Sequence, residues 1–334
     1  MKNSINIILK ILILAFPFFL LNHIYLNSSV WEDKYGLKKF KSVPDNIEIG
    51  NLGSSHGMLS FDYSVEGFND KTCFNFSLLG QTLDFDSSIL EQYINKFKQD
   101  STLIICVSSF ETDGIHDYVY QPEAKLRYYG FLTRNYFGDD YSFKEWFCFN
   151  YLDLFTSKDG LSSLKTVFAN AVELLKSRFK IKNPANHILP VKSQLRTYDN
   201  YTVEEKAEKA IKLVEHWKQL IPPSPGGERI NINYLKKIIN LCEDHEVHTV
   251  VVTTPISREA FQILDENKTY YGIKEFYEDL QSEFSNTKFL NYIDLFFNRN
   301  TYFIDNNHLS PEGAREFSKT IYSDLVKFGY IKQE

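Results

Sequence analysis

A serine near the start of the chain and an aspartate–histidine pair near its end have the residue types of a serine-hydrolase active site. Ser55 follows a glycine-containing turn after the apolar run 47–52, and Asp305 precedes His308 by three residues on a segment that leads into a helix start. A serine hydroxyl is a weak nucleophile until a base removes its proton, and a third group must orient that base. Ser55, His308 and Asp305 could fill these three roles in order.

Each of these signals also has an ordinary structural explanation. A serine beside a glycine is common in turns. An aspartate or serine before a helix is often a cap, and Ser310 followed by Pro311 indicates a helix N-terminus by itself. His56, next to the candidate nucleophile, could line a pocket or form a structural hydrogen bond within the turn. The individual motifs therefore leave both interpretations open.

The elements between these residues predict an α/β fold. Apolar runs predict strands near 46–52, 72–77, 102–108, 247–254 and 287–293, and helices near 84–99, 203–220, 229–245, 257–266, 272–284 and 311–328. Strands that alternate with helices predict a three-layer α/β/α sandwich around a mainly parallel, five-stranded sheet. Sites in such sheets gather at the carboxyl ends of the strands, where Ser55, Gly80, Ser109 and Thr254 all lie.

Taken together, the motifs resemble the SGNH, or GDSL-type, hydrolase superfamily. Its first block, Gly-Asp-Ser, is similar to Gly53-Ser54-Ser55, which places Ser55 rather than Ser54 at the nucleophile position. Its last block, Asp-x-x-His, resembles the segment from Asp305 to His308, and the usual His-Leu-x-x-x-Gly-Ala tail follows. The resemblance implies a serine hydrolase triad and an SGNH-like core.

The same resemblance implies an oxyanion hole that is incomplete in this chain. The segment 75–82 is similar to the second block, whose glycine donates a backbone N–H, so Gly80 is expected to act together with the N–H of Ser55. The third block, Gly-x-Asn-Asp, has no counterpart after the strand at 102–107. Losing one donor typically slows such chemistry about a hundred- to a thousand-fold. Further pocket residues could be His56, Asn75, Ser109 and Thr254.

The N-terminal segment predicts a membrane location. The run from Ile11 to Leu26 is apolar, and Lys2 and Lys10 precede it without any acidic residue, as in an export signal or signal anchor. No small-x-small cleavage site follows. We therefore expect a single-pass transmembrane anchor within 1–28 and an extracytoplasmic domain, with a cleaved signal as the alternative.

The rest of the chain is expected to form a core with an insertion. The ranges 45–114 and 229–334 would supply the two halves of the core, and 115–228 the insertion or cap. The 38 residues from Tyr118 to Phe155 include 14 aromatics, which could stack on sugars, lie at a membrane interface or pack the cap.

The composition narrows the classes of ligand. A net charge of −6 without a stripe of basic residues argues against nucleic acid as a partner. The four cysteines have no metal-ligand spacing, and we expect neither a metal nor another cofactor.

Two functions remain. The chain resembles the membrane-anchored branch of the superfamily, which includes polysaccharide O-acetyltransferases and the D-alanyl-transfer protein of teichoic acid. This resemblance implies an O-acyltransferase or esterase that takes an acyl donor, acts on a cell-envelope glycan and works beside a multi-span membrane acyltransferase. The alternative is a catalytically inactive, structural or partner-binding component of a polysaccharide or teichoic acid assembly system, which the missing third-block asparagine favours.

Overall fold

A computed structural model shows the chain as two compact units. By their contacts, residues 1–42 and 122–190 form the first unit, and residues 43–121 and 191–334 form the second. The expected insertion, 115–228, is thus divided between them. The structure describes residues 2–28, 31–32, 35–107, 125–137, 141–157, 160, 163, 165–167, 198–220, 230–266 and 277–332.

A five-stranded sheet forms the centre of the second unit. Its strands lie in the order β2-β1-β3-β4-β5, and every neighbouring pair is parallel. The predicted α/β fold with a parallel five-stranded sheet is therefore confirmed. The strand bounds are β1 (Ile47–Gly53), β2 (Cys73–Asn75), β3 (Phe97–Cys106), β4 (His248–Thr253) and β5 (Lys288–Asn291).

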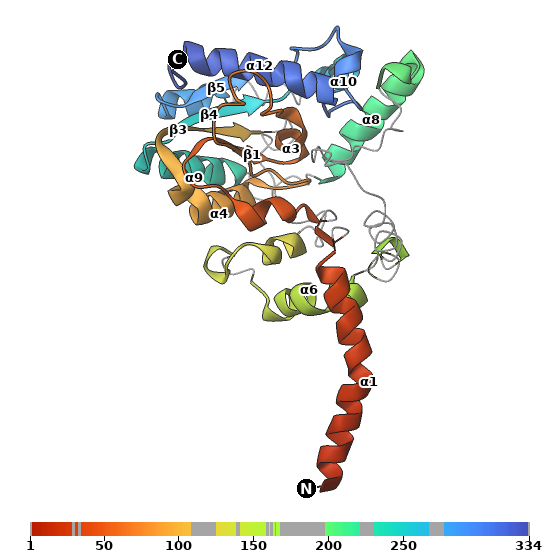
Figure 1. Cartoon of the computed structure of the whole chain (residues 1–334). Helices are drawn as coiled ribbons and strands as arrows, with labels where there is room; N and C mark the ends of the chain where they lie inside the picture. The colour runs from red at the N-terminus through yellow and green to blue at the C-terminus, as the bar shows by residue number, and fades with distance from the viewer. Residues whose placement is uncertain are drawn as a thin grey trace, which may run out of the picture. The chain divides into compact units, whose positions relative to one another are not determined.

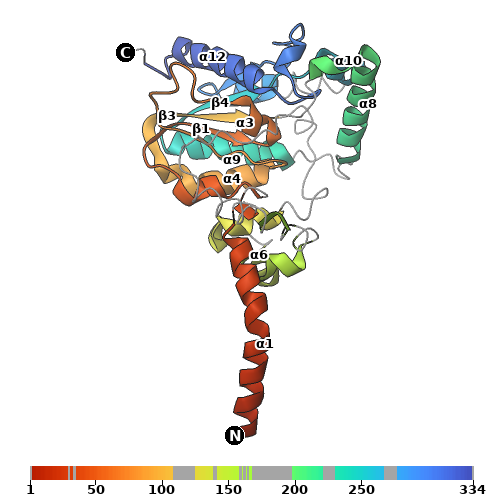
Figure 2. The same ribbon diagram turned by 45° about the vertical axis from the view of Figure 1, so that its right-hand side comes forward.

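Helices cover both faces of this sheet, as in a three-layer sandwich. Figures 1 and 2 show α4 (Leu83–Tyr93) and α9 (Ile230–Asp244) on one face, and α3 (Ser55–Ser60) and α12 (Pro311–Lys327) on the other. Since both faces are covered, the second half of the central strand β3 is apolar: every residue from Leu103 to Cys106 is buried.

The remaining elements complete the second unit. Helix α8 (Val203–Leu220) packs on α10 (Arg258–Glu266), although its sequence falls within the expected insertion. The predicted helix at 84–99 is wrong at its end. The chain passes through η2 (Ile94–Lys96) and enters β3 at Phe97, because Phe97 pairs with Ile47 of β1. Short 3-10 turns lie at η6 (Tyr198–Asn200) and η7 (Asn300–Tyr302).

The first unit is built around α1 (Lys2–Leu26) and α6 (Phe143–Thr156). Asn22 of α1 donates to the backbone oxygen of Tyr151 and accepts from the backbone N–H of Leu154 at 3.3 Å. Three short turns belong to the same unit, η1 (Lys38–Ser42), η3 (Arg127–Gly130) and η4 (Arg134–Tyr136).

The expected transmembrane helix is not found. Within the residues that the structure describes, no helix has both the length and the apolar character needed to cross a membrane.

Candidate active site

The nucleophile candidate stands on a sharp turn between β1 and α3. Gly53, the last residue of β1, has a φ of 133°, and a Cβ there would lie 2.6 Å from the backbone oxygen of Cys106 in β3. Only glycine fits this conformation and this close approach. The turn makes Ser54 the N-cap of α3 and Ser55 its first residue. Ser55 therefore sits at the carboxyl end of the sheet, as its position after the first strand predicts.

His308, the candidate general base, lies on a loop whose two ends are hydrogen-bonded to each other. An isolated antiparallel bridge joins Phe303 to Leu309, and the backbone N–H of Ile304 donates to the oxygen of His308 at 3.0 Å. These contacts enclose the segment that contains Asp305. Asp305 and His308, which lie in no helix or strand, are in this way held in one geometry.

The helix that follows this loop fixes its other end. The Ser310 hydroxyl accepts the backbone N–H of Gly313 at 3.2 Å, and Pro311 opens α12, so the predicted helix start is confirmed. A Cβ on Gly313 would lie 2.1 Å from the backbone oxygen of Tyr302. The glycine of the His-Leu-x-x-x-Gly-Ala tail is therefore needed for close packing.

The structure brings the three predicted catalytic residues together. The Nε2 atom of His308 lies 2.8 Å from the Oγ atom of Ser55, and its Nδ1 atom lies 2.8 Å from Oδ2 of Asp305. A carboxylate can only accept, so Nδ1 carries the proton and Nε2 is left as the acceptor for the serine hydroxyl. This is the tautomer that a general base requires.

Asp305 is held as a carboxylate. Its Oδ1 atom accepts the backbone N–H groups of Asn307 at 2.9 Å and of His308 at 2.8 Å. Burial by itself would raise the pKa of Asp305, but the hydrogen bond and charge of His308 together with these two N–H groups outweigh it and lower the pKa. The group that orients the base is consequently ionised at neutral pH.

His56 lies behind the base and is buried. Its Nε2 atom is 3.2 Å from the side-chain nitrogen of Asn307, and its Nδ1 atom is 3.3 Å from the hydroxyl of Ser54. Burial first, and then the nearby charge of His308, lower the pKa of His56 to about 3. His56 is thus a neutral histidine with a partner on each ring nitrogen, and the residue is only 4% exposed.

Asn75 fastens the end of α3. Its side-chain nitrogen donates to the backbone oxygens of Gly57 at 3.1 Å and Met58 at 3.3 Å. Asn51 of β1 donates to the same Gly57 oxygen at 3.0 Å and to the Ser77 hydroxyl at 2.8 Å. We did not single out Asn51 from the sequence, although an asparagine inside an apolar strand was the signal that could have identified it.

Asp86 is a second residue that sequence reasoning missed. This fully buried side chain of α4 accepts the backbone N–H of Gly53 at 3.1 Å and the side-chain amide of Gln81. Its Oδ2 atom has no hydrogen-bond partner in the described part of the chain. Burial raises the pKa of Asp86 to about 7. An acid that keeps its proton up to about pH 7 therefore holds the turn that precedes Ser55.

The remaining expected pocket residues lie in different surroundings. Gly80 is exposed on the loop between β2 and α4 with a φ of 65°, and a Cβ there would meet nothing within 4 Å. Glycine is favoured at this position by its conformation, since no neighbour crowds it. Thr254 follows β4 and is buried. Ser109 lies outside the described residues.

Asn306 connects the base loop to two other segments, and sequence reasoning missed it as well. Its buried side-chain nitrogen donates to the Tyr198 hydroxyl at 3.1 Å, to the Ser257 hydroxyl at 3.2 Å and to the backbone oxygen of Lys206 at 3.3 Å. Its backbone oxygen accepts the N–H of Ser257 at 2.8 Å. The loop is in this way fixed to α8 and to the start of α10.

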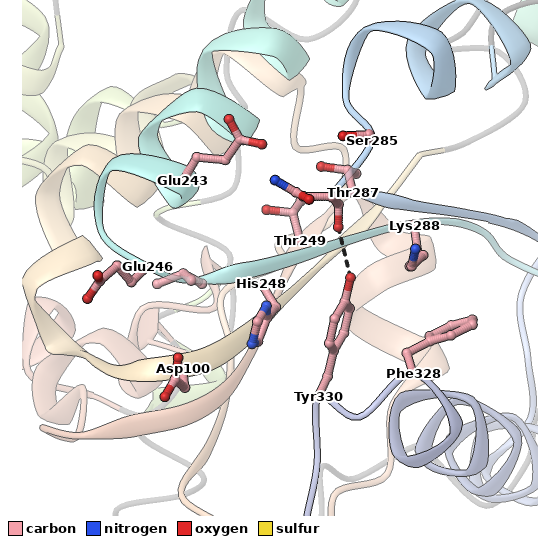
Figure 3. A pocket seen from close by; sticks show the side chains of 12 residues that line it. Asp100, Glu243, Glu246, His248, Thr249, Ser285, Thr287, Lys288, Phe328 and Tyr330 are labelled. Carbon is pink, nitrogen blue, oxygen red and sulfur yellow. Dashed lines mark hydrogen bonds between the residues drawn. The ribbon is translucent and has the colours of Figure 1, made fainter.

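A pocket of about 500 Å³ lies away from these residues. Figure 3 shows Asp100, Glu246, His248 and Tyr330 around it. His248 is the first residue of β4, so the pocket opens at the amino ends of the strands, opposite the edge that carries Ser55. Across the described ranges, no group of three or more histidine, cysteine, aspartate or glutamate side chains is arranged to hold a metal ion.

Comparison with known proteins gives little further information. A family model matches residues 173–328, less than half of the chain, and the match names no activity. This range contains Asp305 and His308 but not Ser55. No curated protein matches the chain.

Proposed function

We propose that this protein is a serine-dependent acyl-ester enzyme of the SGNH type. The observation that carries the proposal is the continuous hydrogen-bonded series from Ser55 through His308 to Asp305, with 2.8 Å at both steps. Residues from opposite ends of the chain form this series at the carboxyl edge of a parallel sheet, where such sites are commonly built.

The geometry supports a two-step acyl transfer. In the first step, Nε2 of His308 takes the hydroxyl proton as Oγ of Ser55 attacks the ester carbonyl carbon, and Asp305 stabilises the imidazolium that forms. The imidazolium then gives its proton to the departing alcohol, leaving an acyl-serine ester. In the second step, His308 deprotonates water or a sugar hydroxyl, which attacks this ester and restores the serine hydroxyl.

The negative charge that develops on the carbonyl oxygen requires hydrogen-bond donors. The backbone N–H of Ser55 belongs to the first turn of α3, whose N–H groups have no acceptor within the helix. We assign Gly80 as the second donor. Its N–H makes no hydrogen bond within the described residues, and its loop leaves the sheet beside β1 at the edge that carries Ser55.

The proposed substrate and location rest on the family resemblance. An O-acetyl or similar small acyl group would move to or from a cell-envelope glycan, with a multi-span membrane acyltransferase as the partner that supplies it. Lys2 and Lys10 before an apolar run support a place at the outer surface of the cell membrane.

The second candidate is a catalytically inactive SGNH-like component of a polysaccharide or teichoic acid assembly system. The observation that favours it is the absence from the sequence of a third-block asparagine after β3. Such a component would keep the fold and the binding surfaces without turnover.

A fluorophosphonate probe separates the two candidates. The full chain should be labelled covalently, and Ser55→Ala should abolish the labelling. Ser54→Ala is the matched control, because it alters the same turn and leaves Oγ of Ser55 in place. An unlabelled wild-type chain with an intact thermal unfolding transition would favour the inactive component.

A further inference from the structure

One face of α6 exposes a row of aromatic side chains. Phe143, Phe147, Tyr151 and Phe155 follow one another at four-residue spacing, and their exposed fractions are 66%, 42%, 50% and 41%. Residues at this spacing lie on one side of a helix. We call these four residues the aromatic face. Phenylalanine at such exposure is unusual on a surface that meets only water.

The rings of this face contact one another and continue onto α1. The ring centroids of Phe147 lie 6.2 Å from Phe143 and 5.3 Å from Tyr151. Phe155 lies 6.1 Å from Phe18 of α1, where Phe16, Phe18 and Phe19 are also largely exposed. Of the 13 large apolar side chains exposed in the described residues, nine lie on these two helices. The apolar surface is thus concentrated at one place.

The other side of α6 is locked into its unit, so the helix cannot rotate to bury the aromatic face. Phe149 and Leu154 are fully buried. The carboxylate of Asp153 is buried as well and accepts hydrogen bonds from Trp31 Nε1 at 3.1 Å and from the Tyr25 hydroxyl at 3.3 Å. Turning α6 would break these bonds and leave a buried charge without partners.

The charge of this unit indicates what covers the aromatic face. Its residues whose side chains the structure describes include nine lysines and arginines and three aspartates and glutamates, whereas the whole chain has a net charge of −6. Lys144, which directly follows Phe143, is exposed. A long basic side chain beside exposed rings can reach lipid phosphates while the rings enter the acyl boundary.

We propose that α6 lies in the interfacial layer of an anionic lipid bilayer, with the aromatic face directed toward the acyl chains. Tyrosine and tryptophan are enriched at this depth of a membrane, and Trp146 lies 5.6 Å from Tyr151. Helix α6 thereby supplies a membrane contact and sets the orientation of the first unit on the surface. This inference goes beyond the proposed function and does not depend on Ser55.

Trp146 provides a test that is specific for α6. The full chain is bound to vesicles of phosphatidylcholine mixed with phosphatidylglycerol, with and without bromine on the acyl chains. The difference in emission between wild type and Trp146→Phe isolates the signal of Trp146 from the other tryptophans. We expect brominated acyl chains to quench this signal. Absence of quenching, whether or not the protein floats with the vesicles, would overturn the proposal.

A matched pair of double variants tests the aromatic face itself. Phe147→Ser with Tyr151→Ser should weaken vesicle binding about tenfold and reduce the quenching of Trp146. Val203→Ser with Ile211→Ser removes two apolar side chains of α8 that are also more than 40% exposed, and should leave both readouts unchanged.

Two further outcomes would also count against the proposal. Equal effects of the two double variants would attribute binding to general hydrophobicity. A change from dimer to monomer, without quenching in either protein, would assign the aromatic face to a second copy of the chain. Ser55→Ala should behave as wild type in every arm, so failure of the catalytic proposal remains distinguishable.

Discussion

The ring of His56 stacks on the ring of His308, with 5.2 Å between centroids and 23° between planes. His56 directly follows the proposed nucleophile, so one turn of backbone supplies both the group that is activated and a support for the base that activates it. Since His56 is neutral, it packs against His308 without opposing the charge that His308 gains during catalysis.

Burial of His56 predicts a particular dependence of stability on pH. Its pKa is about 3 in the folded chain and near 6.5 when unfolded, so the unfolded chain binds more protons between these values. The stability that comes from burying neutral His56 is fully present above about pH 6.5. It should decrease by about 1.4 kcal/mol of unfolding free energy per pH unit as the pH falls toward 3. His56→Gln cannot titrate. Urea unfolding of the two proteins across this range should show that the wild type becomes less stable relative to His56→Gln as the pH falls. A difference in unfolding free energy that does not change with pH would contradict the burial of His56.

Asp86 predicts the opposite slope. Its pKa is about 7 in the folded chain and near 3.8 when unfolded, so here the folded chain binds more protons, and stability should fall as the pH rises from about 4 to 7. Asp86→Asn keeps an oxygen for the N–H of Gly53 and removes the titration. The free energy of unfolding of this variant should therefore increase relative to that of the wild type as the pH rises through the same range. A wild type that instead becomes more stable relative to Asp86→Asn as the pH rises would show that Asp86 is buried as a carboxylate.

The roles of the base and of the orienting group predict an order of effects. His308→Ala should slow fluorophosphonate labelling at least as much as Asp305→Asn, because the aspartate acts only through the imidazole. We expect losses of about a thousandfold or more for either variant, measured as second-order labelling rates. If circular dichroism shows that both variants are folded, near-wild-type labelling rates in both would contradict the proposed roles of His308 and Asp305.

Close packing at Gly313 predicts a stability effect that reaches the base loop. Gly313→Ala places a Cβ 2.1 Å from the backbone oxygen of Tyr302 and should cost more than about 2 kcal/mol of unfolding free energy. Gly80→Ala is the control. This substitution should cost only the strain of a positive φ of 65°, about 1 kcal/mol, because an added Cβ would meet nothing within 4 Å. Equal costs at the two positions would show that the loop yields at Gly313.

The sequence by itself determined the parallel sheet and the segments that border its carboxyl edge. Strand runs such as 102–108 are apolar without alternation, which reflects burial on both faces, and the glycine beside Ser55 and the start of α12 at Ser310-Pro311 follow from local backbone chemistry. These signals act over a few residues, so they can be read in order along the chain. The overrun of the predicted helix at 84–99 arose because its end depends on a pairing between Phe97 and Ile47.

Only the tertiary structure decided which polar residues are buried and what they contact. Asn75, expected near a pocket, holds the end of α3. Asp86 of α4 holds the turn before Ser55, and Asn306 fixes the loop of His308 to Lys206 and Ser257. It also divided the range 115–228 between two units. Burial and hydrogen bonding of this kind depend on residues that are distant in sequence, and the pKa values of His56 and Asp86 shift only once those residues have excluded water from them.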